Sequence, residues 1–519
     1  MNTTSNFYQG DSPALQYIGS WGASLWDNRD MYQMQLHLLL ASLFPIYIGA
    51  HAALRRPASA LQPKKEPSTD GDDDEIDLEP AIEGLRPSDA IMFPVLASIT
   101  LGGLYLLIKW LNDPSLLNKI MTWYFSTLGV FGVGKLAGDS LHVMSSFIFP
   151  SVWSDGKQLY RVEPEFQIQV TGESSRNQPH RTITEKKNPL PSFFSSISFG
   201  EATNTKLWST RALLKNHWIF RGYLHGLLNT KLRVTFHDVA GLALGLVAII
   251  AYNTSGKAWW LTNLMGFGFC YGAFQIMSPT TFWTGSLVLM GLFIYDIVMV
   301  FYTPMMVTVA TTLDVPIKLV FPGPKHGGML GLGDVVLPGI MMALALRFDL
   351  YLHYARKHLQ HEQKQKALYI EATGLWGERF WTSSSKEKNV ADAARFPKTY
   401  FKASVVGYVV GMLTTLVVLN YFKHAQPALL YLVPGVLISL WGTAWVRGEM
   451  ELMWGYTEDG SLDDGEGSEE LTKEEVEKKA EERESRRSKE HANHVFLFSL
   501  SDPKHDLPKA KLVDGEKEE

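Results

Sequence analysis

The chain has 519 residues, and 48 lysines and arginines stand against 53 aspartates and glutamates, giving a formal net charge of −5. Nothing in this near balance points to a nucleic-acid partner, and the single cysteine, Cys270, excludes an intrachain disulfide. The mean hydropathy of −0.03 is typical of a soluble protein, but it averages long uncharged stretches with charged segments between them.

Nine of the uncharged stretches approach the roughly 20 residues that a helix needs to cross a bilayer. They predict an all-α polytopic membrane protein with spans at 33–54, 89–109, 119–137, 236–253, 258–277, 282–302, 328–346, 402–421 and 427–446. The predicted segments are a lumenal tail (1–32), helices 1–3 (33–150), a cytosolic insertion (151–235), helices 4–7 (236–346), a cytosolic loop (347–401), helices 8–9 (402–455) and a cytosolic, largely disordered tail (456–519).

Basic residues set the expected orientation. Arg55 and Arg56 follow the first span directly, whereas the tail before it is net acidic, so the positive-inside rule places the N-terminus in the lumen. Nine crossings then leave the basic regions 151–235 and 347–401 in the cytosol, while eight or ten would put one of them in the lumen. Asn2 begins an Asn-Thr-Thr triplet on the lumenal side, which is a glycosylation candidate or a chance match. Within the insertion, a weak alternation at 166–170 predicts a small strand pair.

Two acids lie inside predicted spans, Asp296 in GLFIYDIVMVFY and Asp334 in GLGDVVLPG. A carboxylate at the bilayer centre costs about 2.5–3.5 kcal/mol, so such residues are rare and usually functional. If one span ends near Tyr302 and the next begins near Gly328, each acid lies roughly 9 Å from the lumenal end of its helix. Two carboxyls at matching depth can share a proton, which is the chemistry of aspartic proteases. Which acid would act as base stays open, because the pair titrates as a unit.

The neighbours of the acids fit a substrate site. Gly331 and Gly333, on either side of Leu332, let a substrate backbone approach closely and weaken the start of the helix. Tyr295 is either a hydrogen-bond donor to Asp296 or an interfacial aromatic. The predicted spans contain neither HExxH nor GxSxG with a partnered histidine, so we expect no metal and no cofactor.

Four segments occur in a fixed order: FIYDIVMVF, MMVTVATTLDVPIKLVFP, MLGLGDVVLPG followed by ALRFD, and FKHAQPALLYLVPG. This set resembles the signal peptide peptidase branch of the presenilin and signal peptide peptidase family of intramembrane aspartyl proteases. The likeness is strong over 236–456, weaker over 33–150 and absent from 151–235 and the distal tail. It implies a presenilin-like fold with Asp296 and Asp334 as the catalytic acids. It also implies substrate-positioning roles for the residues of the last motif, Gln426, Pro427, Ala428 and Leu429.

The resemblance further implies the substrates and the compartment. Relatives of this kind cleave type II membrane segments, such as signal peptides left after signal peptidase has acted, in the endoplasmic reticulum membrane. Quality-control components of that membrane and a second copy of the chain are then possible partners. Two other interpretations stay open: a catalytically inactive member of the family, and a proton-coupled transporter that uses its acids as a relay. The transporter does not account for the order of the motifs.

Overall fold

The computed structural model describes residues 29–61, 83–111, 113–156, 158–164, 166–171, 186–224, 228–313, 315–323, 327–360, 366–369, 373–383, 396–422, 426–458 and 496–501. Helices stand at all nine predicted span positions: α2 (Arg29–Ala52), α3 (Asp89–Leu111), α4 (Ser115–Ile148), α6 (Phe236–Thr254), α7 (Trp259–Ile276), α8 (Phe282–Ile297), α10 (Gly333–Gln360), α12 (Thr399–Phe422) and α13 (Leu429–Arg447). Within the described ranges, seven of them, all but α4 and α7, are long and apolar enough to cross a membrane. The chain is therefore a mostly helical, multi-pass membrane protein.

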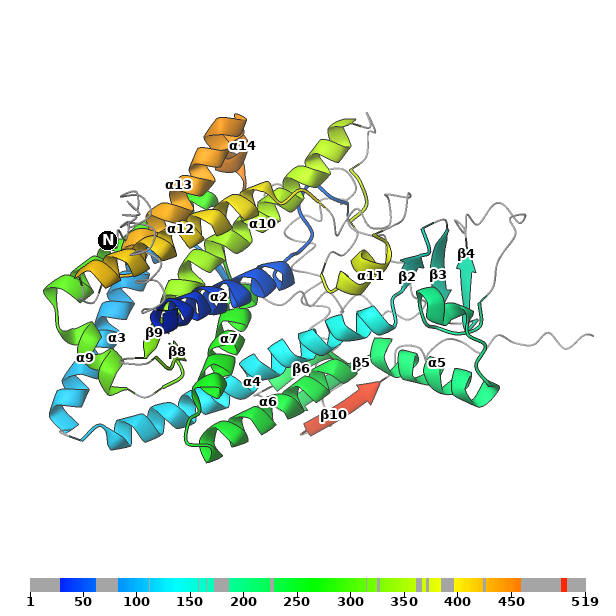
Figure 1. Ribbon diagram of the computed structural model, residues 1–519, viewed down its shortest axis with the longest axis horizontal. Helices are drawn as coiled ribbons and strands as arrows, with labels where there is room; N and C mark the ends of the chain where they lie inside the picture. The colour runs from blue at the N-terminus through cyan, green and yellow to red at the C-terminus, as the bar shows by residue number, and fades with distance from the viewer. Residues whose placement is uncertain are drawn as a thin grey trace, which may run out of the picture.

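The composition of α4 and α7 explains why they fall outside the seven. Glycines and serines recur along the 34 residues of α4, and α7 has polar groups such as Asn263 and Gln275 among its 18 residues. Both helices nevertheless pack inside the bundle, α4 along α6 and α7 against α2 and α10 (Figure 1).

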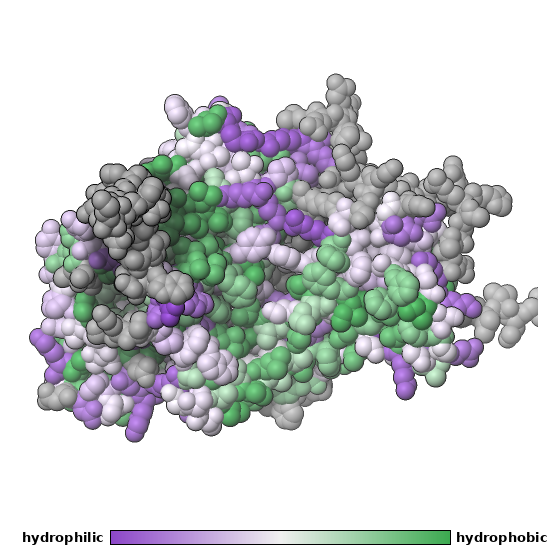
Figure 2. All heavy atoms as spheres, viewed as in Figure 1, coloured by the Kyte–Doolittle hydropathy of each residue, from purple (hydrophilic) through white to green (hydrophobic). Residues whose placement is uncertain are grey.

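The outer helices present apolar side chains to their surroundings. None of the residues of α3 is buried, and Ile99 and Trp110 are 65% and 79% exposed. Leu246 and Val247 of α6 are similarly exposed. Figure 2 shows broad hydrophobic areas on this face of the molecule, with hydrophilic residues at its edges and in a band across its upper part. Apolar surface of this extent is what a lipid-facing bundle presents.

The bundle is organised around α10. This helix contacts α2, α7, α8, α12 and α13, and nearly all its residues from Val335 to Leu352 are at least partly buried. Its apolar side chains join those of the surrounding helices in one large hydrophobic cluster. Figure 1 shows α10 between the α12–α13 pair and α2. The helix that carries Asp334 is thus held from several sides.

Glycines let two helix pairs approach closely. A Cβ on Gly245 of α6 would lie 2.5 Å from the Val130 carbonyl oxygen of α4, and one on Gly411 of α12 would lie 2.7 Å from the Tyr431 carbonyl oxygen of α13. Because lipid supplies no hydrophobic drive between helices, such small-residue contacts and van der Waals packing hold membrane helices together.

The connection between the two acid-bearing helices is structured. After α8 the chain forms a π-helical turn, η3 (Val298–Tyr302), and then the short helix α9 (Met305–Thr312). It continues as an antiparallel pair of strands, β8 (Lys318–Phe321) and β9 (Gly328–Gly331), with Val320 opposite Met329. The prediction that the seventh span begins near Gly328 is wrong, because residues 328–331 are extended and α10 begins at Gly333.

The insertion contains more structure than the expected strand pair. Strands β2 (Val152–Ser154), β3 (Leu159–Glu163) and β4 (Ile168–Thr171) form an antiparallel sheet in the order β2–β3–β4. The chain then forms the 3-10 turn η2 (Ser192–Ser196), the helix α5 (Glu201–Lys215), and strands β5 (His217–Leu224) and β6 (Leu228–Thr235). From the distal tail, β10 (Phe496–Ser501) pairs with β5, so the prediction of a disordered tail does not hold for this segment.

The predicted loop 347–401 starts too early, because α10 continues to Gln360. Two charged residues inside this extension, Arg347 and Asp349, have specific partners. The carboxylate of Asp349 accepts hydrogen bonds from the backbone N–H groups of Thr399, Tyr400 and Phe401, the first turn of α12. Paired in this way, a buried charge does not interrupt the helix. The short helix α11 (Trp376–Trp381) follows in the same region and packs against α4.

The chain after α13 and the short helix α14 (Met450–Gly455) closes an ion cluster that we call the C-terminal clasp: Glu458, Arg347, Arg55 and Ser278. Glu458 forms an ion pair with Arg55, and its Oε1 lies 2.7 Å from Arg347 Nε. The Ser278 hydroxyl donates to Glu458 Oε2 at 2.9 Å and lies 2.6 Å from Arg347. Because Ser278 lies in β7 (Met277–Pro279), just before α8, the clasp ties α2, α8 and α10 together.

Candidate active site

Asp296 lies at the end of the regular part of α8. Thr281 caps the start of this helix, since its hydroxyl accepts the backbone N–H of Thr284. Asp296 is the second-last residue of α8, directly before the π-helical turn, and is only 3% exposed. Single π-helical turns within helices occur frequently at functional sites. The Asp296 carboxylate accepts a hydrogen bond of 3.1 Å from the backbone N–H of Leu429.

Asp334 lies in the first turn of α10, not about six residues into a helix. The segment before it mixes glycine with Met329, Leu330 and Leu332, and pairing with β8 holds residues 328–331 extended as β9. A Cβ built on Gly331 would lie 3.4 Å from Asp334 Oδ2, so the strand runs directly beside the carboxyl. Gly331 and Gly333 are exposed, whereas Leu332 is 9% exposed and its carbonyl accepts the N–H of Val335 and Val336.

The two carboxyl groups lie close enough for their charges to interact. The charge of Asp296 acts on Asp334, and their helices pack together, with a Cβ on Gly285 of α8 falling 2.6 Å from the Met341 sulfur of α10. Each carboxyl also lies at a helix N-terminus, Asp334 in the first turn of α10 and Asp296 against the first residue of α13. Free N–H groups and the helix dipole at such positions stabilise negative charge.

The Gln426–Leu429 motif forms the junction between loop and helix at the start of α13. Pro427 is buried, Ala428 is the residue before the helix, and Leu429 is the first helical residue, 4% exposed. The carbonyls of Pro427 and Ala428 begin the hydrogen bonding of the helix. Gln426 is half-buried. The Leu429 N–H of this motif donates the hydrogen bond that joins it to Asp296.

Two candidates from the sequence, Tyr295 and Asn2, remain. Tyr295 is half-buried on α8, and among the described residues no hydrogen bond joins its hydroxyl to Asp296. Asn2 lies outside the described residues. No group of three or more potential metal ligands occurs in the described part of the chain.

Two residues near the acids were not anticipated from the sequence. The Tyr408 hydroxyl of α12, fully buried, donates to the Asp334 backbone carbonyl at 3.4 Å. Asn263 of α7 pairs with the backbone of Val320 in β8: its amide donates to the carbonyl at 2.9 Å, and its carbonyl accepts the N–H at 2.7 Å. A buried asparagine in a membrane helix was the available signal, since polar groups there need partners. With Asn263 on one side of β8 and β9 on the other, the hairpin is fixed beside Asp334.

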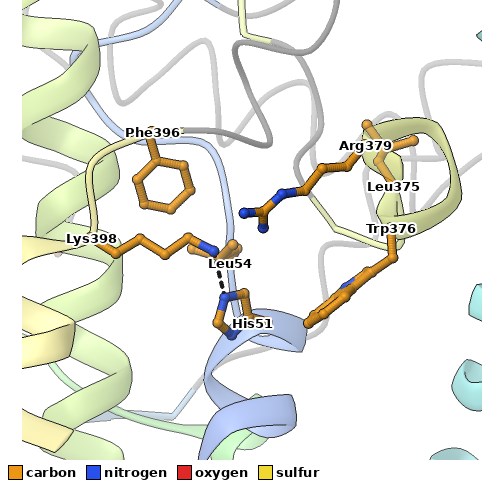
Figure 3. A pocket seen from close by; sticks show the side chains of 7 residues that line it. All are labelled: His51, Leu54, Leu375, Trp376, Arg379, Phe396 and Lys398. Carbon is orange, nitrogen blue, oxygen red and sulfur yellow. Dashed lines mark hydrogen bonds between the residues drawn. The ribbon is translucent and has the colours of Figure 1, made fainter. Parts of the chain in front are cut away.

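A separate basic pocket lies where α2 ends, near the start of α12 (Figure 3). The Lys398 amine lies 2.7 Å from His51 Nε2, while His51 Nδ1 lies 2.8 Å from the Tyr47 carbonyl oxygen. Arg379 of α11 points toward the same space, and Trp376 and Phe396 line it. Burial, together with the charge of Arg379, lowers the pKa of Lys398 to about 8. This pocket is separate from Asp334, because Asp349, whose charge acts on Lys398, is fifteen residues further along α10.

Known proteins resemble this chain over most of its length. The family model described as signal peptide peptidase matches residues 78–460. Signal peptide peptidase of Mus musculus is 28% identical over 86% of this chain and 90% of its own length, and that of Homo sapiens is 28% identical over 82% and 84%. A probable intramembrane protease of Schizosaccharomyces pombe is 36% identical over 43% of this chain and 65% of its own length. The matched region contains α3 to α14 and every motif of the site described above. The chain belongs to the signal peptide peptidase family of intramembrane proteases.

Proposed function

We propose that the chain is an aspartic endopeptidase that cleaves peptide bonds within the membrane, with Asp296 and Asp334 as its catalytic pair. The observation that carries this proposal is the placement of the two carboxyls on packed neighbouring helices, one of them bonded to the Leu429 N–H. Two acids with one shared proton supply both a base for water and an acid for the carbonyl oxygen.

In this proposal, the surroundings of each carboxyl determine which one acts as the base and which one acts as the acid. The Leu429 N–H stabilises negative charge on Asp296, so Asp296 takes the proton from the attacking water. Asp334 then keeps the shared proton and donates it to the carbonyl oxygen as the tetrahedral species forms. When that species collapses, Asp296 gives its proton to the departing amine and Asp334 takes a proton back from a hydroxyl of the tetrahedral species, so the pair again holds one shared proton.

The strand β9 suits an opened substrate. A helical backbone hides its carbonyls, so a membrane segment must unwind before water can attack it, and its freed N–H and C=O groups then need partners. Among the described residues β9 pairs with β8 along one edge only. An extended segment added to the other edge, next to Gly331, would have its backbone groups satisfied beside Asp334.

Substrate and location follow from the family. Two of the relatives are named signal peptide peptidases, and we propose type II membrane segments, including signal peptides left by signal peptidase, as substrates. The proposed location is the endoplasmic reticulum membrane. Quality-control components there, and a second copy of the chain, are proposed partners.

We further propose nine spans with a lumenal N-terminus. Helices α4 and α7 occupy the third and fifth predicted span positions, and Arg55 and Arg56 follow α2. Tags at residues 202 and 512 in sealed microsomes should both be digested by added protease, because both segments are then cytosolic. A protected tag at 512 would contradict nine crossings.

The function is tested with the purified chain in proteoliposomes that contain a type II signal peptide. We expect two products cut within the membrane segment, and labelling of the chain by a transition-state-analogue inhibitor of aspartic proteases. A signal peptide whose helix-weakening residues are replaced by leucine should be cut much more slowly, although it still binds. An inactive family member would bind the peptide without cutting it, and a transporter would carry protons without releasing product. Either result would refute the proposal.

A further inference from the structure

A cavity of about 460 Å³ lies between α5 and the β2–β3–β4 sheet of the insertion. Small-molecule sites commonly have roughly 300–1,000 Å³. Ser151, which lines it, follows the last residue of α4 by three positions, so the cavity begins just beyond the end of a membrane helix. In Figure 1 this module lies at the opposite end of α4 from α9.

Arg211 lines the cavity with a buried guanidinium. Its side chain is 5% exposed, and within the described ranges its Nε has no hydrogen-bond partner. The guanidinium carbon lies 5.8 Å from the centre of the Trp208 ring, which covers one side of the group. A buried donor without an acceptor is costly. A donor of this kind on the wall of a cavity indicates a ligand that accepts hydrogen bonds.

Lys215 lies one helical turn after Arg211 and lines the same cavity. The described acid that faces both of them is Glu378 of α11, whose Oε1 lies 3.6 Å from Lys215 Nζ. Two cations against one carboxylate leave one positive charge. Burial lowers the pKa of both Arg211 and Lys215, so the site favours an additional anion.

The other residues that line the cavity include both apolar and polar side chains. Val162 and Pro164 supply apolar surface, while Ser209 and Gln167 supply polar groups. Gln167 has a φ of 54°, a left-handed conformation that is unusual for a residue other than glycine or asparagine. Such strained residues cluster at ligand sites.

We propose that this cavity binds a phosphate group carried on a hydroxylated organic body, with the phosphate between Arg211 and Lys215. A phosphate has enough oxygens to accept from the planar fork of Arg211 and the ammonium of Lys215 together. The volume left over holds the organic body, whose hydroxyls meet Gln167 and Ser209. The phosphate comes from a lipid headgroup at the membrane surface or from a soluble phosphorylated compound.

The test uses the full chain in phosphatidylcholine nanodiscs. Inositol 1-phosphate, titrated by calorimetry, represents the soluble source, and nanodiscs with added phosphatidylinositol 4-phosphate, read by native mass spectrometry, represent the lipid. We expect at least one probe to bind, and Arg211→Gln to weaken its binding at least tenfold. Lys206→Gln, which removes an exposed cation from the same helix, should leave binding unchanged.

A second variant covers the case in which Arg211→Gln does not fold. Ala212→Phe changes no charge, starts from an exposed position and fills part of the cavity, so it should also abolish binding. Binding of one probe alone identifies the source of the phosphate. The proposal is overturned if neither probe binds at millimolar concentration, or if Ala212→Phe binds as tightly as the unmodified chain.

Discussion

The backbone N–H of Leu429 donates a 3.1 Å hydrogen bond to the carboxylate of Asp296, although the two residues are 133 positions apart. The bond joins the start of α13 to the end of α8. In the proposed mechanism the proline-alanine-leucine motif holds the carboxylate in position and stabilises its charge through a main-chain donor, which only a replacement by proline would remove.

The first prediction concerns this donor. Replacing the Leu429 amide with an ester, by incorporating the matching α-hydroxy acid, removes the N–H and keeps the side chain. A hydrogen bond to a charged group contributes about 1.5–3 kcal/mol, so we expect kcat to fall roughly tenfold to a hundredfold. The matched control is an ester at Leu430, whose N–H donates, among the described residues, to the Pro427 carbonyl. Equal activity of both ester variants would show that the Asp296 contact does not matter.

The sequence predicted helices at the nine span positions and singled out the two acids as candidates, because long apolar runs and charges within them are local signals. It misplaced the start of the seventh span, because Gly328–Gly331 is as apolar as a helix and only pairing with β8 makes it a strand. It missed Asn263 and Tyr408, whose partners are distant in sequence. The extension of α10 was missed for a related reason: Arg347 and Asp349 read as loop residues until their buried partners are known.

The second prediction concerns the hairpin beside Asp334. Asn263→Ala removes both hydrogen bonds to the part-buried backbone of Val320, and each such bond contributes roughly 0.5–1.5 kcal/mol. We expect a lower melting temperature and a larger loss of kcat than of substrate binding, because the strand next to the acids loosens. The control is Thr262→Val, because among the described residues the Thr262 hydroxyl donates to the Ala258 carbonyl, at the start of the same helix. Activity equal to that of this control would argue against a role for the hairpin.

The third prediction concerns the C-terminal clasp. Burial raises the pKa of Glu458, but the guanidiniums of Arg347 and Arg55 outweigh it and hold the pKa below its usual value. A carboxyl with a depressed folded-state pKa contributes stability that is complete above its unfolded value of 4.5 and is lost as the pH falls through the folded value.

We therefore expect Glu458→Gln to lower the stability at pH 7 by about 3–5 kcal/mol, the usual cost of removing one partner from a buried ion pair. Its melting temperature should also change less than that of the unmodified chain between pH 7 and pH 3. Glu451→Gln, at an exposed site on α14, should leave both the stability at pH 7 and its dependence on pH unchanged. If the melting temperatures of the unmodified chain, Glu458→Gln and Glu451→Gln changed by the same amount between pH 7 and pH 3, the role given to Glu458 would be wrong.

The most direct test of the account is the turnover of purified Asp296→Asn and Asp334→Asn variants in proteoliposomes with a type II signal peptide. An amide has the shape of the carboxyl but cannot cycle a proton, so both variants should bind the peptide and yield no product. Circular dichroism and melting curves close to those of the unmodified chain establish that the bundle is intact. Product formation near the normal rate by either variant would contradict the catalytic pair.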